Sequence, residues 1–382
     1  MSEYFNLLFS PLHGGTILLY TLIFIVASIL GNKVQYVTRN GQHIFSMKFF
    51  ICLFLFLCAF YVFNDVGIDT DHYRTYYLEF VTPQDVADHY GAVEKLYQYL
   101  NIVLHVITYN EYIGVGIIRF IQLAILFVAL YKLRNRINIG LAIMAYMAFF
   151  YYDSFNLLRS SLAGSICLLG MAFLYEKKIF ITLALALLAY GIHHSAIFFV
   201  VTLLLYIICY HTPIRKFKKV VPVVAVFALF VVLNIGANII NQLLAADFAN
   251  GRYDYVESHG SVMGIFILLK YSIPFLILHL VNKSKENNYF LDSAWDIDFI
   301  WTIVGFALAL LAYQIGMLTR AAIYFSSSFI FLLPNYIYTK ESISRTNVTK
   351  FIFVFVLYFM FMYITTIGNL YNISELGPFK FI

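Results

Sequence analysis

Residues 149–169 read FFYYDSFNLLRSSLAGSICLL, two apolar runs with a short polar centre. The centre carries Asp153, Asn156 and Arg159. Apolar runs separated by a tight polar connection predict two helices that cross a membrane and meet at one surface. An arginine in such a connection calls for an explanation, because this chain holds few charges.

The composition of the whole chain favours a membrane fold. Of its 382 residues, 62% are hydrophobic and 12% are charged, about half the charged fraction of a soluble domain. We therefore expect an all-α, polytopic integral membrane protein with a single membrane domain over residues 1–382 and about twelve transmembrane helices. The predicted spans are 14–31, 45–63, 111–131, 139–152, 160–175, 179–193, 195–210, 219–239, 262–281, 297–314, 318–338 and 351–368.

Lysines and arginines indicate the orientation, because short basic loops stay in the cytoplasm. One alternating set of loops carries 16 of the 25 basic residues: Lys33, Arg39, Lys132, Arg134, Arg136, Lys177, Lys178, Arg215, Lys216, Lys218, Lys219, Lys283, Lys285, Lys340, Arg345 and Lys350. This distribution predicts that both termini lie outside. It also makes residues 64–110 and 240–261 outer loops. In the first, EKLYQYLNIVLHVITYN (94–110) has the spacing of a short amphipathic helix that is expected to lie on the outer leaflet, or to dip into it, as part of a lid.

Four arginines remain on the predicted outer face, which is otherwise poor in cations: Arg74, Arg159, Arg252 and Arg320. Arginine binds phosphate bidentately and stays charged in a partly dry site. A lipid-linked phosphate is therefore one candidate ligand for this set. The alternative is that each arginine pairs with an acid such as Asp153, Asp254 or Glu257, or reaches toward lipid headgroups.

Two further features carry candidate chemistry. Asp69 and Asp71 form an Asp-x-Asp pair, which suits a metal ion, a general base or a solvated loop. His193 and His194 interrupt an apolar run at the predicted outer surface, where a histidine either accepts a proton or hydrogen-bonds a helix end. Adjacent histidines point to different sides of a helix, so a two-histidine metal site is not expected.

Other enzyme classes find no support in the sequence. The cysteines, Cys52, Cys58, Cys167 and Cys209, fall within predicted spans and form no disulfide framework. The chain has no phosphate-binding Walker loop, no dinucleotide fingerprint and no Gly-x-Ser-x-Gly elbow. ATP-driven transport and serine hydrolysis are therefore not indicated.

Five stretches together resemble the EpsG-like family of exopolysaccharide and O-antigen polymerases, which are related to the Wzy polymerases. They are GIDTDHYRTYY (67–77), NLLRSSLAGSI (156–166), HHSA (193–196), LTRAAIYF (318–325) and LGPFKFI (376–382). The family usually has glutamine after the arginine, where this chain has Ser160.

The resemblance implies a glycosyltransferase similar to the GT-C class, with no cofactor and no metal, in the bacterial cytoplasmic membrane. It implies that undecaprenyl-pyrophosphate-linked oligosaccharides are joined on the outer face, in O-antigen, capsule or exopolysaccharide synthesis. A chain-length regulator would be a protein partner, and no nucleic acid is expected. The candidate catalytic residues are His193, Asp69 and Asp71. The candidate substrate-binding residues are Arg74, Asn156, Arg159, Arg252, Arg320, Tyr73, Tyr77, Tyr324 and His194.

Two other functions use similar residues. A flippase or exporter of lipid-linked oligosaccharides also needs arginines in a membrane cavity, but charges deep in the spans and an internal repeat would be expected. Only Arg119 and Lys270 are basic residues well inside predicted spans. A membrane O-acyltransferase would use a histidine, but it takes its acyl donor from the cytoplasm, where the predicted loops are short and basic.

Overall fold

The computed structural model describes residues 11–37, 43–67, 69–88, 93–211, 292–312 and 321–332, with isolated residues between 270 and 359. The chain divides into two compact units. Unit 1 comprises residues 1–194 and 329–382, and unit 2 comprises residues 195–328.

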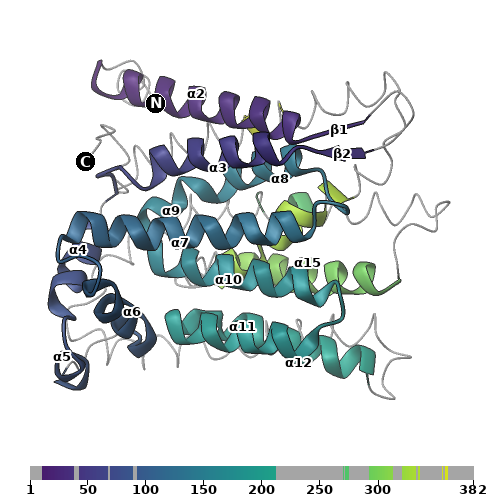
Figure 1. The fold of residues 1–382 in the computed structure, drawn as a ribbon. Helices are drawn as coiled ribbons and strands as arrows, with labels where there is room; N and C mark the ends of the chain where they lie inside the picture. Colours follow the sequence, from purple (N-terminus) through teal and green to yellow (C-terminus); the bar gives the residue numbers. More distant parts are fainter. Residues whose placement is uncertain are drawn as a thin grey trace. The chain divides into compact units, whose positions relative to one another are not determined.

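Unit 1 is built around helices that run side by side (Figure 1). Neighbouring helices in this set are mainly apolar along their whole length, as expected for a membrane bundle. The helices are α2 (Pro11–Val34), α3 (Met47–Tyr61), α7 (Glu111–Lys132), α8 (Ile139–Tyr146), α10 (Leu158–Leu174) and α11 (Ile179–Ile192). Two of them contain stretches long and apolar enough to cross a membrane, Gly15–Val34 and Glu111–Lys132, and the others are shorter apolar helices.

Short elements connect these helices. Residues 64–110 form α4 (Thr70–Glu79), α5 (Pro83–Asp88) and α6 (Lys95–His105). Helix α8 continues through a π-helical turn, η1 (Met147–Tyr151), and the one-turn helix α9 (Asp153–Asn156) before α10 begins. Wide π turns often lie beside functional sites, and this turn directly precedes the polar connection that holds Arg159.

A short hairpin interrupts the helical fold. Strands β1 (Gln35–Val37) and β2 (His43–Phe45) pair antiparallel, with Gln35 opposite Phe45. The sequence predicted no strand here. After α2 ends, the backbone donors and acceptors need new partners, and the two arms of the connection supply them to each other.

The connections gather at two ends of the unit 1 bundle. Helices α4, α5 and α6 lie at one end and the β-hairpin lies at the other (Figure 1). At the hairpin end, the Gln35 side chain accepts from the Ile139 N–H at 2.7 Å, and Lys132 pairs with Glu176 at 2.7 Å. The predicted basic loops around residues 33, 134 and 177 therefore share one end. Which end faces the cytoplasm stays a prediction.

Local signals fix where helices begin and end. The Asn110 side chain accepts hydrogen bonds from the first N–H groups of α7, and Asn138 does the same for α8. Lys177 adopts a left-handed conformation with φ of 62° in the tight turn between α10 and α11. Gly31 and Gly140 lie where α2 and α8 approach each other closely, and a methyl group at Gly31 would lie 3.0 Å from the Cα of Gly140.

Unit 2 contains helices α12 (Ile197–His211) and α15 (Asp292–Ala312) and a 3-10 turn, η4 (Ile323–Phe325). Trp301 of α15 is fully buried, and its ring lies 5.4 Å from that of Phe199 and 6.4 Å from that of Tyr206. The Ser195 and Tyr324 hydroxyls are 2.9 Å apart. A turn, η5 (Ser328–Leu332), crosses the boundary between the units.

Helices occupy most of the predicted spans that the structure describes. The predicted spans from 14–31 to 195–210, and 297–314, each coincide with a described helix or helix pair. The span predicted at 318–338 is described only in part, as short helical turns. The spans predicted at 219–239, 262–281 and 351–368 lie wholly or largely outside the described residues, so the number of spans stays a prediction.

The two ends of unit 1 give a test of orientation. In a protein with Cys52 replaced by Ser, Glu79→Cys on α4 and Asn135→Cys beside α7 both put an exposed thiol on the surface. A membrane-impermeant thiol reagent added outside should label the cysteine at 79 and leave that at 135 unlabelled until the membrane is opened. The reverse pattern would place α4 to α6 in the cytoplasm.

Candidate functional site

A buried carboxylate, Glu94, connects three distant parts of unit 1. Glu94 precedes α6 and is only 3% exposed. Its Oε2 pairs with the Arg159 Nη1 at 2.6 Å, and its Oε1 lies 2.6 Å from the His193 Nδ1. The His194 backbone N–H also donates to Oε1, at 3.0 Å. One side chain therefore holds together the start of α6, the start of α10 and the end of α11.

Aromatic rings surround the arginine of this junction. The guanidinium of Arg159 lies 5.8 Å from the ring centroids of both Tyr76 and Tyr97. Its Nε is buried and has no hydrogen-bond partner. Arg159 thus keeps donor capacity beyond its bond to Glu94, in surroundings where a charge-assisted hydrogen bond is strong.

Glu94 is ionised at any pH at which the protein would work. Burial raises the pKa of this carboxyl, but the hydrogen bond from His193 and the positive charge of Arg159 outweigh that effect and lower the pKa to about 2. A base that weak is poorly suited to accept a proton near neutral pH. Glu94 is better suited to orient the groups that contact it.

His193 has the geometry of an oriented proton acceptor. It caps the end of α11 in an extended conformation. With Nδ1–H donating to Glu94, the other ring nitrogen, Nε2, carries the lone pair. A carboxylate on Nδ1 fixes the tautomer and stabilises the imidazolium that forms after proton transfer, as in hydrolase triads.

The neighbouring histidine is placed differently. His194 is exposed, and its ring lies 5.2 Å from the ring of Tyr190. It contacts Glu94 only through its backbone N–H. Of the two histidines singled out in the sequence, the structure brings the side chain of His193 into the Glu94 junction.

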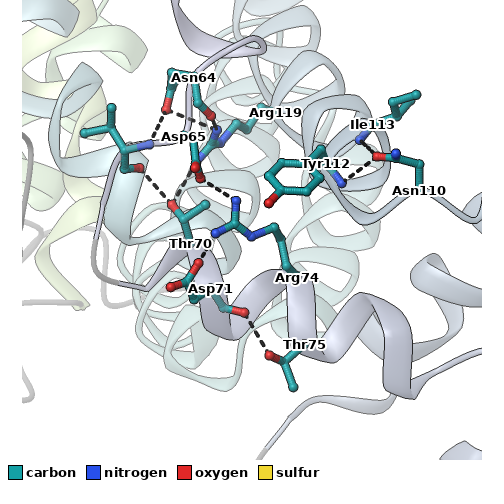
Figure 2. A network of polar contacts seen from close by, with 11 residues as sticks. Asn64, Asp65, Thr70, Asp71, Arg74, Thr75, Asn110, Tyr112, Ile113 and Arg119 are labelled. Carbon is teal, nitrogen blue, oxygen red and sulfur yellow. Dashed lines mark hydrogen bonds and ion pairs between the residues drawn. The ribbon is translucent and has the colours of Figure 1, made fainter. Parts of the chain in front are cut away.

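Another arginine, which is fully buried, organises the loop before α4. Arg119, in the middle of α7, is 1% exposed. Its Nη1 donates to the Asn64 carbonyl at 2.7 Å, and its Nη2 donates to the Thr70 hydroxyl at 3.0 Å. Figure 2 shows these bonds converging from the two ends of the loop. Arg119 thereby fixes the segment that leads into α4.

Two of the predicted site residues pair with each other in the same network. Arg74 forms ion pairs with Asp65 and Asp71, and its guanidinium lies 4.5 Å from the ring centroid of Tyr112 (Figure 2). Arg74 is therefore paired with acids in this structure, and its predicted role in binding phosphate stays a prediction. Asp69 is the residue that precedes α4.

The predicted residues Tyr73, Tyr77 and Asn156 lie beside these networks. Tyr73 is buried, donates its hydroxyl proton to the Asn156 carbonyl at 3.1 Å, and contacts the ring of Tyr97. Tyr77 is fully buried, with its ring stacked on His105 at 4.2 Å. Tyr77 therefore joins α4 to α6 by packing.

Gly67 permits the close approach of this loop to Asn156. Its φ of +108° lies in a region that side chains rarely adopt. A methyl group here would also lie 3.0 Å from the Phe155 carbonyl oxygen. The stretch GIDTDHYRTYY (67–77) therefore has a backbone reason to begin with glycine.

Some predicted residues fall elsewhere. Arg252 and Arg320 lie outside the described residues. Tyr324 belongs to unit 2 and bonds to Ser195. Within the described part of the chain, no three His, Cys, Asp or Glu side chains converge on a point suited to a metal ion.

Sequence reasoning missed Glu94 as a site residue. It is one of seven acids in the loop of residues 64–110, and its neighbour Lys95 suggests an ordinary surface pair. Its partners lie 65 and 99 residues further along the chain. The available signal was the position of Glu94 at the start of the predicted amphipathic segment 94–110.

Comparison with known protein families places the chain in a family. A family model described as the EpsG family matches residues 47–378. No curated protein and no solved structure matches the chain.

Glu94 provides a test of stability. Its pKa in the folded protein lies below the ordinary value of 4.5. Its ionised form therefore stabilises the fold above about pH 4.5, and that contribution is lost as the pH falls toward 2. Glu94→Gln leaves Arg159 without its anion and should lower the free energy of unfolding at pH 7 by about 3 kcal/mol.

Thermal unfolding of the purified protein in detergent measures this effect. The Glu94→Gln variant should also lose less stability than wild type between pH 4.5 and pH 3. Glu79→Gln, which changes an exposed carboxylate on α4, is the matched control and should leave stability nearly unchanged. Equal stability of the two variants would show that Glu94 does not hold the junction together.

Proposed function

The chain belongs to the EpsG family, and on that premise we propose that it polymerises polysaccharide as a membrane glycosyltransferase. Its substrates in this proposal are oligosaccharide repeat units linked to undecaprenyl pyrophosphate. The observation that carries the proposal is the Glu94 junction, where one buried carboxylate holds an arginine and a histidine. These two side chains match the two needs of the reaction, a cation for the leaving group and a base for the acceptor.

The leaving group of the proposed reaction is a lipid pyrophosphate. The bond between the anomeric carbon of the donor glycan and a pyrophosphate oxygen breaks, and both bonding electrons go to that oxygen. A fixed cation stabilises the negative charge that develops there. Arg159 is suited to this role, since its Nε has no partner and its guanidinium is held between Glu94 and two tyrosines.

The acceptor is a sugar hydroxyl of another repeat unit. Its oxygen forms the new bond to the anomeric carbon, and its proton passes to the Nε2 of His193. Glu94 keeps the opposite nitrogen protonated and stabilises the resulting imidazolium. His193 returns the proton to solvent before the next addition.

The ion pairs favour His193 over Asp71 as the base. The carboxylate of Asp71 is engaged by the guanidinium of Arg74, whereas His193 has a second ring nitrogen beyond the one that faces Glu94. We assign Asp71 and Arg74, together with Arg119, to holding the α4 segment in place. Asp69 stays a competing candidate base.

The proposal also covers the membrane face, the protein partner and the product of the reaction. Polymerisation takes place at the end of the bundle that holds α4 to α6, on the outer face of the bacterial cytoplasmic membrane. A chain-length regulator is the expected protein partner, and the product is O-antigen, capsule or exopolysaccharide. In this proposal the charge of the leaving group is met by arginine side chains without a metal.

Substitutions at the junction test the reaction. His193→Ala should slow polymer formation by roughly 100-fold, the scale of a general base. Arg159→Lys keeps the charge but loses the planar fork of donors, and it should also reduce polymer strongly. The measurement is polymer length on gels together with the amount of lipid-linked single repeats, at matched protein abundance in the membrane.

His194→Ala is the matched control, because that side chain is exposed and contacts Glu94 only through its backbone. It should retain most activity. Normal polymer from His193→Ala alongside none from Asp69→Asn would move the base to the α4 segment. Accumulation of single repeats on the cytoplasmic face in cells without the protein would indicate a flippase.

A further inference from the structure

Helix α6 has its polar and apolar faces reversed relative to a helix on a water-soluble domain. Its outward side chains are mainly apolar, with Val103 62% exposed, and the two residues that directly follow the helix, Val106 and Ile107, are 88% and 67% exposed. Tyr99 and Leu96 are exposed on the same helix. An outward apolar face suits contact with the acyl chains of the outer leaflet. The inward face then has to be explained by something other than ordinary core packing.

The inward face of α6 is a polar stripe that starts at the Glu94 junction. Gln98 and Asn101 follow Glu94 at helical spacing, and both are completely buried. Tyr97 lies beside them, also completely buried, with its ring near the guanidinium of Arg159. The stripe therefore begins at the proposed reaction centre and continues along the helix.

Several groups of this stripe have no hydrogen-bond partner. They are the Tyr97 hydroxyl, the Gln98 Oε1 and both polar atoms of the Asn101 side chain, and the Arg159 Nε is unpartnered beside them. The Gln98 amide nitrogen is bonded, to the Val93 carbonyl at 2.7 Å. Buried polar groups are rarely left without partners, so a cluster of them next to one site calls for a ligand.

We propose that this stripe, Tyr97, Gln98 and Asn101, is a saccharide subsite for the repeat unit that reacts at the Glu94 junction. The inference rests on the proposed function for its substrate. Asn101 offers a free donor and a free acceptor, which complement a sugar hydroxyl that both accepts and donates. The stripe carries no cation beyond Arg159, so a neutral, hydroxyl-rich ligand fits it better than a second phosphate does.

The subsite is closed in this structure, because the unpartnered groups are fully buried. Binding therefore requires α6 to move outward enough to admit a sugar ring. The outward face can slide within the lipid boundary during that movement, while sugar hydroxyls satisfy the inward groups. The unmet hydrogen bonds of the closed form favour opening once a ligand is present.

Asn101→Leu tests the subsite. Leucine is similar in size and removes two unpaired polar atoms, so the variant should be at least as stable to heat as wild type. The binding probe is the free repeat-unit oligosaccharide, released by mild acid from the lipid extract of cells that lack the protein. Its affinity for the purified variant should fall by roughly 10-fold. Inorganic pyrophosphate, the second probe, should bind the variant and wild type equally.

Tyr97→Phe gives a second measurement, because it removes only a hydroxyl and keeps the ring. Val103→Ala on the outward face is the control and should bind both probes as wild type does. Weaker oligosaccharide binding by Asn101→Leu or Tyr97→Phe with unchanged pyrophosphate binding supports the subsite. Wild-type affinity for the oligosaccharide in both variants overturns it and leaves the proposed function standing. A wild-type protein that binds neither probe contradicts the proposed function itself.

Discussion

The pairing of Glu94 is the interaction on which the rest of the site depends. A carboxylate that is 3% exposed is stable only when its charge is compensated. Both of its oxygens are used, one by Arg159 and one by His193 with the His194 N–H. These partners come from different helices. The need to compensate one buried charge therefore sets the relative positions of α6, α10 and α11.

Arg119 is also a buried charge that needs compensation, and it is compensated by hydrogen bonds to neutral oxygens. It is a fully buried cation in the middle of an apolar helix, and carbonyl and hydroxyl oxygens of the α4 segment provide its hydrogen bonds. Among the described residues it forms no ion pair with a buried carboxylate, although Asp65 lies close enough to interact with it. The two arginines thus have different roles. Arg119 fixes the loop before α4, whereas Arg159 keeps its Nε donor available near the proposed base, His193.

The sequence was informative where local pattern determines structure. Long apolar runs predicted the helices, and the distribution of lysines and arginines predicted which connections share an end. Arg159 and His193 were recognised as candidates because charged and titratable groups are rare in this chain. Their common partner was not recognised, because Glu94 lies 65 and 99 residues away from them and looks like any other acid of its loop.

The pairing of Arg74 with Asp65 and Asp71 was equally hidden. Spacing places Asp71 one helical turn before Arg74, but charge alone does not distinguish a phosphate clamp from an internal ion pair. Which face of α6 points inward could also not be predicted from the sequence. Its periodicity shows two faces, and only the packed structure shows that the polar face points inward.

The most direct test of the account is the polymerisation rate of Glu94→Gln beside those of wild type and of Glu79→Gln, which changes an exposed carboxylate, measured on reconstituted vesicles with equal amounts of protein. The imidazole of His193 faces the Glu94 carboxylate, and Arg159 reaches it only through that carboxylate. Glutamine cannot hold both side chains as an anion does, so the rate of Glu94→Gln should fall by roughly 100-fold, the scale of a general base, while Glu79→Gln keeps the wild-type rate. A wild-type rate in Glu94→Gln would contradict the claim that Glu94 orients the catalytic histidine.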